Sequence, residues 1–198
     1  MTSTPASPAL APQLEDLIVQ LDDCSRRARE LVDGLSPAQL AARPAPESWS
    51  VAECIEHLTL TNRPFPALLR GVYDEARRGG LVGDGPFKTD LMGRLLVWTI
   101  EPPARLKVKA RAPFQPVDVG DPGRVLPAFL ELQEEIKACV REAAGLRLDK
   151  VKIPSPVDAR VKYNAYAGLR IIAAHERRHL WQASRARERV LATETRRQ

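Results

Sequence analysis

The feature that most constrains the fold is a long amphipathic segment near the end of the chain, residues 164–190. When these residues are projected at ~100° per position, as in an α-helix, the apolar and small side chains fall on one face. His175 and His179 lie in the middle of that face, whereas Arg177 and Arg178 lie away from its centre. An apolar helical face is stable only when it packs against a hydrophobic core. The sequence therefore predicts a helix that carries two histidines into the core.

Three further segments repeat apolar residues at intervals of three and four, and each is predicted to be a helix. They span residues 10–35, 50–78 and 121–145. Ser50 and Glu53 have the spacing of a capping box at the start of the second segment. Pro64 and Pro66 lie inside that segment and remove backbone donors, so we expect a bend or break near Asn62.

The long connection at 81–121 is the least regular part of the chain, because glycine and proline interrupt it repeatedly. Short helices are expected at 90–100 within it and, earlier in the chain, at 36–41. A connection of this length can carry the chain along a whole bundle, so that the helices on either side run parallel. No strand is convincing. The predicted fold class is all-α, a four-helix bundle with a long crossover loop between its second and third helices.

The composition indicates one domain without covalent staples. The chain has 198 residues, of which 44% are hydrophobic, which is sufficient for a single core. We expect a flexible leader at 1–9, one domain at 10–191 and a frayed tail at 192–198. The three cysteines are widely spaced and form no C-x-x-C pair, which favours a reducing, cytoplasmic setting over a disulfide framework.

Charge and hydropathy restrict the class of partner. No apolar run approaches the ~20 residues that span a bilayer, and the first residues do not have the pattern of a secretory signal. We therefore expect no membrane segment. The formal net charge of +5 is compatible with an acidic partner, but the basic residues are scattered and are not interleaved with aromatic residues. This distribution disfavours nucleic-acid binding.

The two histidines at 175 and 179 predict a metal site. One buried histidine is commonly structural, but two that lie one turn apart are costly to bury unless a group accepts both lone pairs, as a metal ion does. The only other histidine is His57, on the predicted helix at 50–78, and helical bundles build metal sites from side chains on facing helices. His57, His175 and His179 are therefore the predicted ligands, with open positions for water or a thiol. Cys54 is either a fourth soft ligand or, as we favour, a small buried hydrophobic residue.

The letters HERRH at 175–179 also match the H-E-x-x-H motif of zinc proteases. Here two arginines separate the histidines, although that helix is buried in those proteases. The extended protease motif is absent, because Gln182 and Arg185 stand where it requires glycine and histidine. No strand is evident that would hold an extended peptide. The sequence therefore disfavours a protease, and we expect Glu176 to be a surface charge beside arginine rather than a catalytic base.

Two tryptophans flank these motifs. Trp49 directly precedes the capping box, and we expect it to pack as a hydrophobic staple or lid over the end of the bundle. Trp181 projects beside the histidine face, and we expect it to pack in the core rather than line a pocket.

Taken together, the segments SWSVAECIEHLTLTN and AAHERRHLWQA resemble the DinB-like (DinB/YfiT-like) superfamily of metalloenzymes. The hallmarks of that family are a Trp-Ser/Thr start and a histidine on the second helix, with H-x-x-x-H and a Leu-x-Gln-like tail on the last. The resemblance extends from the first predicted helix to Ala186. It implies a four-helix bundle of up-down-down-up topology. It also implies a divalent metal ion (zinc, nickel, iron or manganese in different relatives) held by His57, His175 and His179.

The resemblance also implies a class of function. Some relatives are transferases or isomerases that use a low-molecular-weight thiol such as bacillithiol, mycothiol or glutathione. We therefore expect a metal-dependent enzyme that acts on a small molecule, either with such a thiol as cosubstrate or as a hydrolase, since a metal ion activates both thiols and water. The alternative is a non-catalytic interaction module with a structural or vestigial metal site, which acts through a helix-helix homodimer.

Overall fold

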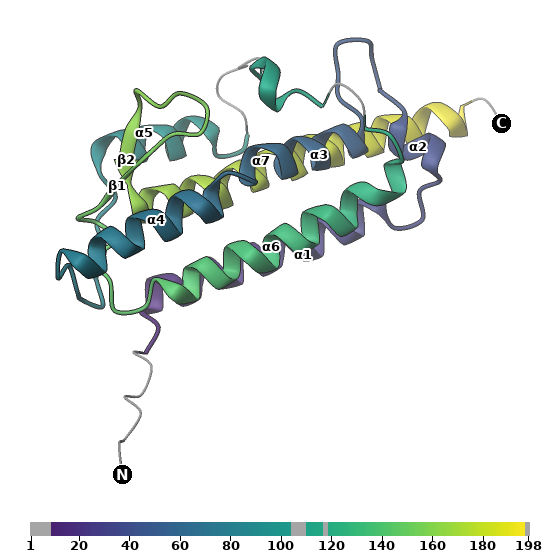
Figure 1. Ribbon diagram of the computed structural model, residues 1–198. Coiled ribbons are helices and arrows are strands. Elements are labelled where there is room, and N and C mark those ends of the chain that lie inside the picture. The colour runs from purple at the N-terminus through teal and green to yellow at the C-terminus, as the bar shows by residue number, and fades with distance from the viewer. Residues whose placement is uncertain (1–8, 104–109, 117–118, 197–198) are drawn as a thin grey trace.

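The fold is taken from a computed structural model, which describes residues 9–103, 110–116 and 119–196 (Figure 1). Most of this part of the chain is helical, as the all-α prediction requires. The long helices are α1 (Pro12–Val32), α3 (Val51–Asn62), α4 (Phe65–Arg78), α6 (Val125–Glu142) and α7 (Ala165–Thr195). The shorter elements are α2 (Pro37–Ala41), α5 (Leu91–Ile100), the 3-10 turns η1 (Ala112–Phe114) and η2 (Pro122–Arg124), β1 (Lys152–Pro154) and β2 (Lys162–Asn164). The predicted leader at 1–9 falls almost wholly outside the described residues.

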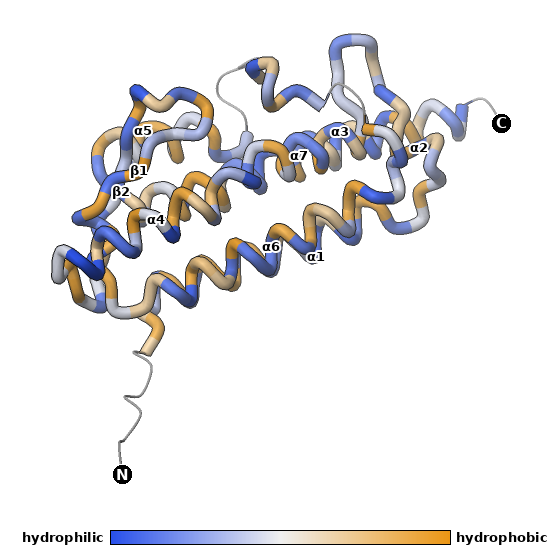
Figure 2. Tube along the Cα trace, in the orientation of Figure 1, coloured by the Kyte–Doolittle hydropathy of each residue, from blue (hydrophilic) through white to orange (hydrophobic). Residues whose placement is uncertain are grey.

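The long helices lie side by side (Figure 1), and their buried hydrophobic residues form two clusters, to both of which α1, α6 and α7 contribute. Helix α7 contacts both α1 and α3, and α6 contacts α1, α3 and α4. Hydrophobic and hydrophilic residues alternate at short intervals along these helices (Figure 2), as expected for helices that bury one face. Leu14, Leu17 and Leu21 of α1 and Phe129 and Ile136 of α6 are among the most deeply buried side chains.

The predicted capping box and helix break are both confirmed. Ser50 Oγ accepts a hydrogen bond from the N–H of Glu53 at 3.1 Å, and Glu53 Oε2 accepts one from the N–H of Ser50 at 2.8 Å. Helix α3 then ends at Asn62 and α4 begins at Phe65. The break falls immediately before Pro64 because proline cannot continue the hydrogen-bond ladder. Helix α3 therefore has a fixed start and a fixed end on either side of His57.

The expectation that the chain has no strand is wrong. Strands β1 and β2 pair in antiparallel register, with Ile153 opposite Tyr163. Both of these side chains are buried, whereas their neighbours Lys152 and Lys162 are exposed. This alternation is the period-2 pattern of a half-buried strand, but each strand has only three residues. Runs this short, with Pro154 at the end of the first and Pro156 in the connection, give too few repeats to be recognised in the sequence.

The hairpin packs directly on the first turns of α7. A Cβ added to Gly168 would lie 2.5 Å from Cδ1 of Ile153, so the close approach depends on glycine. Asn164 ends β2 and also caps α7, because its Oδ1 accepts a hydrogen bond from the N–H of Ala167 at 2.8 Å. Helix α7 runs to Thr195, five residues beyond the predicted end at Val190. None of the described helices has both the length and the apolar character required to cross a bilayer.

Candidate metal centre

The three histidines that the sequence singled out come together between two neighbouring helices. His57 projects from α3, and His175 and His179 project from consecutive turns of α7. One potential ligand atom from each residue lies within 4.8 Å of the other two. The ring centroids of His57 and His179 are 4.4 Å apart, and those of His175 and His179 are 4.5 Å apart. The spacing is short enough for all three rings to contact a single ion.

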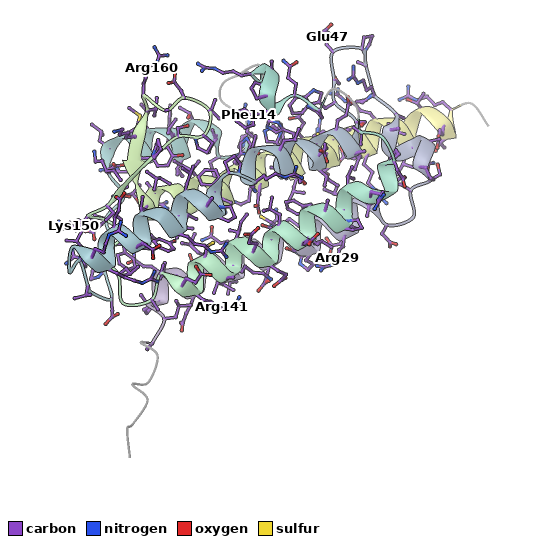
Figure 3. The ribbon with its side chains drawn as sticks, viewed as in Figure 1. Arg29, Glu47, Phe114, Arg141, Lys150 and Arg160 are labelled. Atoms are coloured by element: carbon purple, nitrogen blue, oxygen red, sulfur yellow. The ribbon has the colours of Figure 1, made fainter. Side chains whose placement is uncertain are left out.

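A backbone carbonyl of η1 fixes the orientation of His57. Nδ1 of His57 lies 2.6 Å from the carbonyl oxygen of Phe114 (labelled in Figure 3). Because a carbonyl oxygen only accepts, the hydrogen bond places the proton of the neutral ring on Nδ1. The lone pair of Nε2 is then free to bind a metal. An imidazole held by a hydrogen bond from its other nitrogen is the usual arrangement in metal sites.

The surroundings of the site keep the histidines neutral. His57 and His179 are buried, with 4% and 8% of their surface exposed. Burial lowers the pKa of His57, although the hydrogen bond to Phe114 opposes this effect. Burial and the positive charges that His57 and Arg178 can carry lower the pKa of His175 to about 3. The same causes, together with His175, lower the pKa of His179. Neutral imidazole is the form that binds metal ions.

One nitrogen in the site has no partner in the described part of the chain. Nδ1 of His179 is buried and forms no hydrogen bond with any described residue. Leaving a buried polar atom unsatisfied costs about 1–3 kcal/mol, so such an atom in a native structure calls for a specific explanation. Three neutral imidazoles, one of them with an orphaned nitrogen, form a donor set that fits a divalent metal ion.

Trp49 forms one wall of this cluster. Its ring centroid lies 4.7 Å from that of His57 and 5.7 Å from that of His179. Trp49 therefore has the expected packing role, and the side chains that it packs against are histidine rings of the site. Trp181, by contrast, is 42% exposed, so the expectation that it packs in the core is wrong. Trp181 lies at the edge of the histidine face, and its side chain turns outward. A helical projection with a fixed angular step does not separate such an edge position from a buried one.

Glu176 is not a surface charge, and that expectation is also wrong. The side chain is fully buried, and its Oε1 accepts a hydrogen bond from Nδ2 of Asn62 at 2.7 Å. Its Oε2 accepts a second hydrogen bond, from Nε2 of Gln133 at 2.9 Å. Burial raises the pKa of Glu176 to about 8, although the hydrogen bonds from Gln133, Cys24 and Asn62 oppose the shift. The sequence reasoning missed Asn62 and Gln133, since they lie 114 and 43 residues from Glu176 along the chain.

The two arginines of the motif attach α7 to the C-terminal end of α5 and, through Gln20, to α1. Nε of Arg177 donates to Glu101 Oε1 at 2.6 Å, and Nη1 donates to Gln20 at 2.6 Å. Nη1 of Arg178 donates to the carbonyl oxygen of Thr99 at 3.3 Å. The HERRH segment thus directs histidines, a carboxylate and arginines to different neighbours, which explains its mixed composition.

Cys54 has the hydrophobic role that we favoured. Its side chain is fully buried in a cluster with Val51, Ile55 and Leu58. Burial raises the pKa of the thiol, so it stays protonated. Among the described residues, the group of close metal-binding side chains consists of the three histidines alone.

Three histidines from two helices lie close enough to share one ion. The fold and the site together define a helical protein with a candidate metal centre. A comparison with known families assigns it more closely. The family model of the DinB superfamily matches residues 20–183, which include all three histidines, and the chain belongs to this superfamily. Comparisons with curated proteins and with solved structures gave no match.

Proposed function

We propose that His57, His175 and His179 bind one divalent metal ion, and that the protein is a metal-dependent enzyme acting on a small molecule. The observation that carries this proposal is the convergence of three neutral imidazoles, one of which, His179, has a buried Nδ1 with no partner among the described residues. A divalent ion with three protein ligands is a Lewis acid that makes a thiol or water a better nucleophile at neutral pH.

The surrounding residues have separate roles in this proposal. The carbonyl of Phe114 holds His57 in the tautomer that directs Nε2 toward the ion. Trp49 covers two of the rings and keeps water from that side. Arg178 places positive charge beside the histidines, which favours an anionic substrate such as a low-molecular-weight thiol that carries a carboxylate. The zinc, nickel, iron and manganese ions of relatives are all candidates.

We also infer that the long helices form a four-helix bundle of up-down-down-up topology, with α3 and α4 together as the second helix. The pairs α1 and α7, α7 and α3, α3 and α6, and α6 and α1 are all in contact, which supports a closed ring of four. The connection that contains α5 and η1 is then the crossover. It delivers the Phe114 carbonyl to the site, so the crossover takes part in building the metal centre.

The test of the metal site is elemental analysis of protein that has been stripped and then reloaded with each metal. Wild type should bind one ion per chain, and His57→Ala should bind at least tenfold more weakly, because loss of a ligand leaves only two imidazoles. Arg185→Ala is the matched control, because this exposed residue is also on α7 but is remote from the donor set. Unchanged metal content in His57→Ala would rule out the three-histidine site.

The test of activity uses glutathione with 1-chloro-2,4-dinitrobenzene for transfer and p-nitrophenyl acetate for hydrolysis. In the transfer reaction the S–C bond forms, chloride leaves and the thiol proton passes to solvent. Turnover in either assay that a chelator abolishes would support an enzyme. A stoichiometric, tightly bound ion without chelator-sensitive turnover would favour the interaction module with a structural metal site.

A further inference from the structure

Helix α5 exposes an unusual amount of apolar surface. Only Gly93 is buried, where it lies against α7. Leu91, Leu95 and Trp98 are 80%, 52% and 57% exposed. These side chains recur at intervals of three and four residues and so share one side of the helix. A contiguous exposed apolar surface of this kind indicates a binding site.

Two open pockets meet along this helix. The first has a volume of about 350 Å³. Its lining residues are Gln13, Phe87, Lys88, Thr89, Arg94, Tyr166 and Arg170. The second has a volume of about 630 Å³ and is lined chiefly by Leu91, Leu95, Val97 and Trp98, with Arg94, Arg170 and Glu101. Both volumes are in the range of small-molecule sites, ~300–1,000 Å³. Because Arg94 and Arg170 line both pockets, the pockets adjoin.

The first pocket is cationic. Three basic residues line it, and its described lining contains no carboxylate. Nη1 of Arg170 donates to Thr89 Oγ1 at 2.8 Å, which holds the guanidinium in place. The side chains of Lys88 and Arg94 form no ion pair or hydrogen bond with any other residue that the structure describes. The pocket therefore carries positive charges, those of Lys88 and Arg94, that no carboxylate of the described residues pairs with.

The nearest acidic groups are engaged elsewhere. Asp90 adjoins the pocket in sequence, but its Oδ1 accepts from the N–H of Gly93 and its Oδ2 from the N–H of Asn164, both at 3.0 Å. Glu101, at the far end of the second pocket, is paired with Arg177. Asp16 lies near Tyr166 and accepts a hydrogen bond from Gln20 at 2.6 Å. A bound anion would thus not have to displace a carboxylate from the arginines.

We propose that the two pockets together bind an amphipathic small-molecule anion. Its carboxylate or phosphate group lies between Lys88, Arg94 and Arg170, and its aliphatic part lies along α5 on Leu91, Leu95 and Trp98. Bidentate arginine contacts and a desolvated apolar chain are the two contributions that such a ligand needs. None of the three histidines lines either pocket, so this site is separate from the metal centre.

The basic groups argue against a second copy of the chain as the occupant. A two-fold contact through α5 pairs the same surface of both copies. It would bring Arg94 and Arg170 of one copy toward those of the other, and like charges in an interface are unfavourable. A small anion would instead pair with these arginines, and its aliphatic part would cover the apolar side chains.

The test is calorimetric titration of the purified full chain with monomeric dodecanoate, below its micelle-forming concentration. Dodecanoate should bind at one site. Acetate, which lacks the chain, and dodecyl maltoside, which lacks the charge, should bind at least tenfold more weakly. Arg94→Gln and Leu95→Ser should each weaken dodecanoate binding about tenfold or more. Both residues are exposed, so neither change should affect folding, which circular dichroism checks.

Arg141→Gln is the matched control for the loss of one charge. Arg141 is exposed and lies on α6, away from α5 and the hairpin (Figure 3), so this variant should bind dodecanoate as the wild type does. Equal binding of dodecanoate and dodecyl maltoside, or unchanged binding in Arg94→Gln, would overturn the proposal. Binding to phosphatidylcholine–phosphatidylglycerol vesicles but not to monomeric dodecanoate would overturn it in favour of a lipid surface. A dimer that Leu95→Ser dissociates would overturn it in favour of a second copy.

The outcome is independent of the proposed metal function. Arg94→Gln and Leu95→Ser should retain the metal content of the wild type, and His57→Ala should retain dodecanoate binding. Loss of metal in Arg94→Gln would mean that the pocket and the metal centre are one site, which also contradicts the proposal.

Discussion

The carboxylate of Glu176 accepts a hydrogen bond from Nδ2 of Asn62, so the second letter of the HERRH segment is tied to the last residue of α3. The histidines on either side of Glu176 also meet α3, through His57. One stretch of α7 therefore contacts α3 both through the candidate metal centre and through a buried amide–carboxylate cluster.

This cluster predicts a large loss of stability in Glu176→Ala. The change removes the acceptor of Nδ2 of Asn62 and the shortest of the hydrogen bonds that Nε2 of Gln133 donates, and it opens a cavity in the core. Unsatisfied buried donors cost about 1–3 kcal/mol each, and the cavity adds to this. We expect the free energy of unfolding in urea to fall by about 2–4 kcal/mol. Glu188→Ala, at an exposed position of the same helix, should change it by less than about 0.5 kcal/mol, and an equally small effect of Glu176→Ala would contradict the assigned role.

The ion pair of Glu53 with Arg43 predicts a pH dependence of stability. Burial tends to raise the pKa of Glu53, but hydrogen bonds from Arg43 and from the N–H of Ser50 outweigh this effect and lower it below 4.5. A carboxyl group whose pKa is lower in the folded state stabilises the fold above its unfolded pKa, and this contribution is lost as the pH falls through the folded pKa. Glu53→Gln keeps a capping-box residue but loses the charge. Its unfolding free energy should be lower than that of the wild type at neutral pH.

The pH profile provides the control for this prediction. The difference between the wild type and Glu53→Gln should shrink as the pH falls below about 4.5. Arg43 is half exposed, so solvent screening keeps the difference small. A difference that grows toward acid pH would have the wrong sign and would refute the assignment.

The helices and the pair of histidines on α7 were predictable because each leaves a periodic signal in the sequence. His175 and His179 share a face through their spacing of four, and His57 was the only histidine left to join them. The break at Pro64 follows from proline chemistry, which is local. The helix periodicity, the spacing of His175 and His179 and the proline break all act within a few residues along the chain, whereas His57 was assigned by elimination.

The parts that the sequence did not reveal depend on contacts between distant residues. Glu176 can be buried because side-chain amides of α3 and α6 donate hydrogen bonds to it. No periodic pattern in the sequence indicates that these two amides face Glu176. The Phe114 carbonyl that orients His57 is a backbone group 57 residues away, so no side-chain pattern could indicate it. The hairpin is too short to show alternation, and its packing on α7 depends on Gly168.

Removal of metal should lower the thermal stability of the wild type. A ligand that binds only the folded state stabilises it by RT ln(1 + [L]/Kd), about 2.7 kcal/mol at a hundredfold excess over Kd. We therefore expect a chelator to lower the melting temperature of metal-loaded wild type by several degrees. His179→Ala should melt at the same temperature with and without chelator. A chelator effect of equal size in both proteins would mean that the metal binds elsewhere.

Two helical glycines allow the packing of α5 on α7 to be tested with a matched pair of variants. A Cβ added to Gly93 would lie 2.3 Å from Cβ of Ala167, a contact between atoms fixed to two backbones. Gly93→Ala must therefore push α5 away from α7, and such overpacking costs about 1–3 kcal/mol. A Cβ added to Gly71 of α4 meets no atom within 4 Å. Gly71→Ala should thus stabilise the protein by up to about 1 kcal/mol, because alanine is the better helix former.

Urea unfolding of the two variants measures the difference directly. Gly93→Ala should unfold at lower urea than the wild type and Gly71→Ala at the same or higher urea, although both make the same chemical change within a helix. The Arg177–Glu101 ion pair at the end of α5 provides a second test of whether α5 is displaced. Glu101→Gln should be less destabilising in the Gly93→Ala background than alone, since a displaced helix has already weakened that pair. Full additivity of the two changes would show that α5 stays in place when Gly93 is replaced.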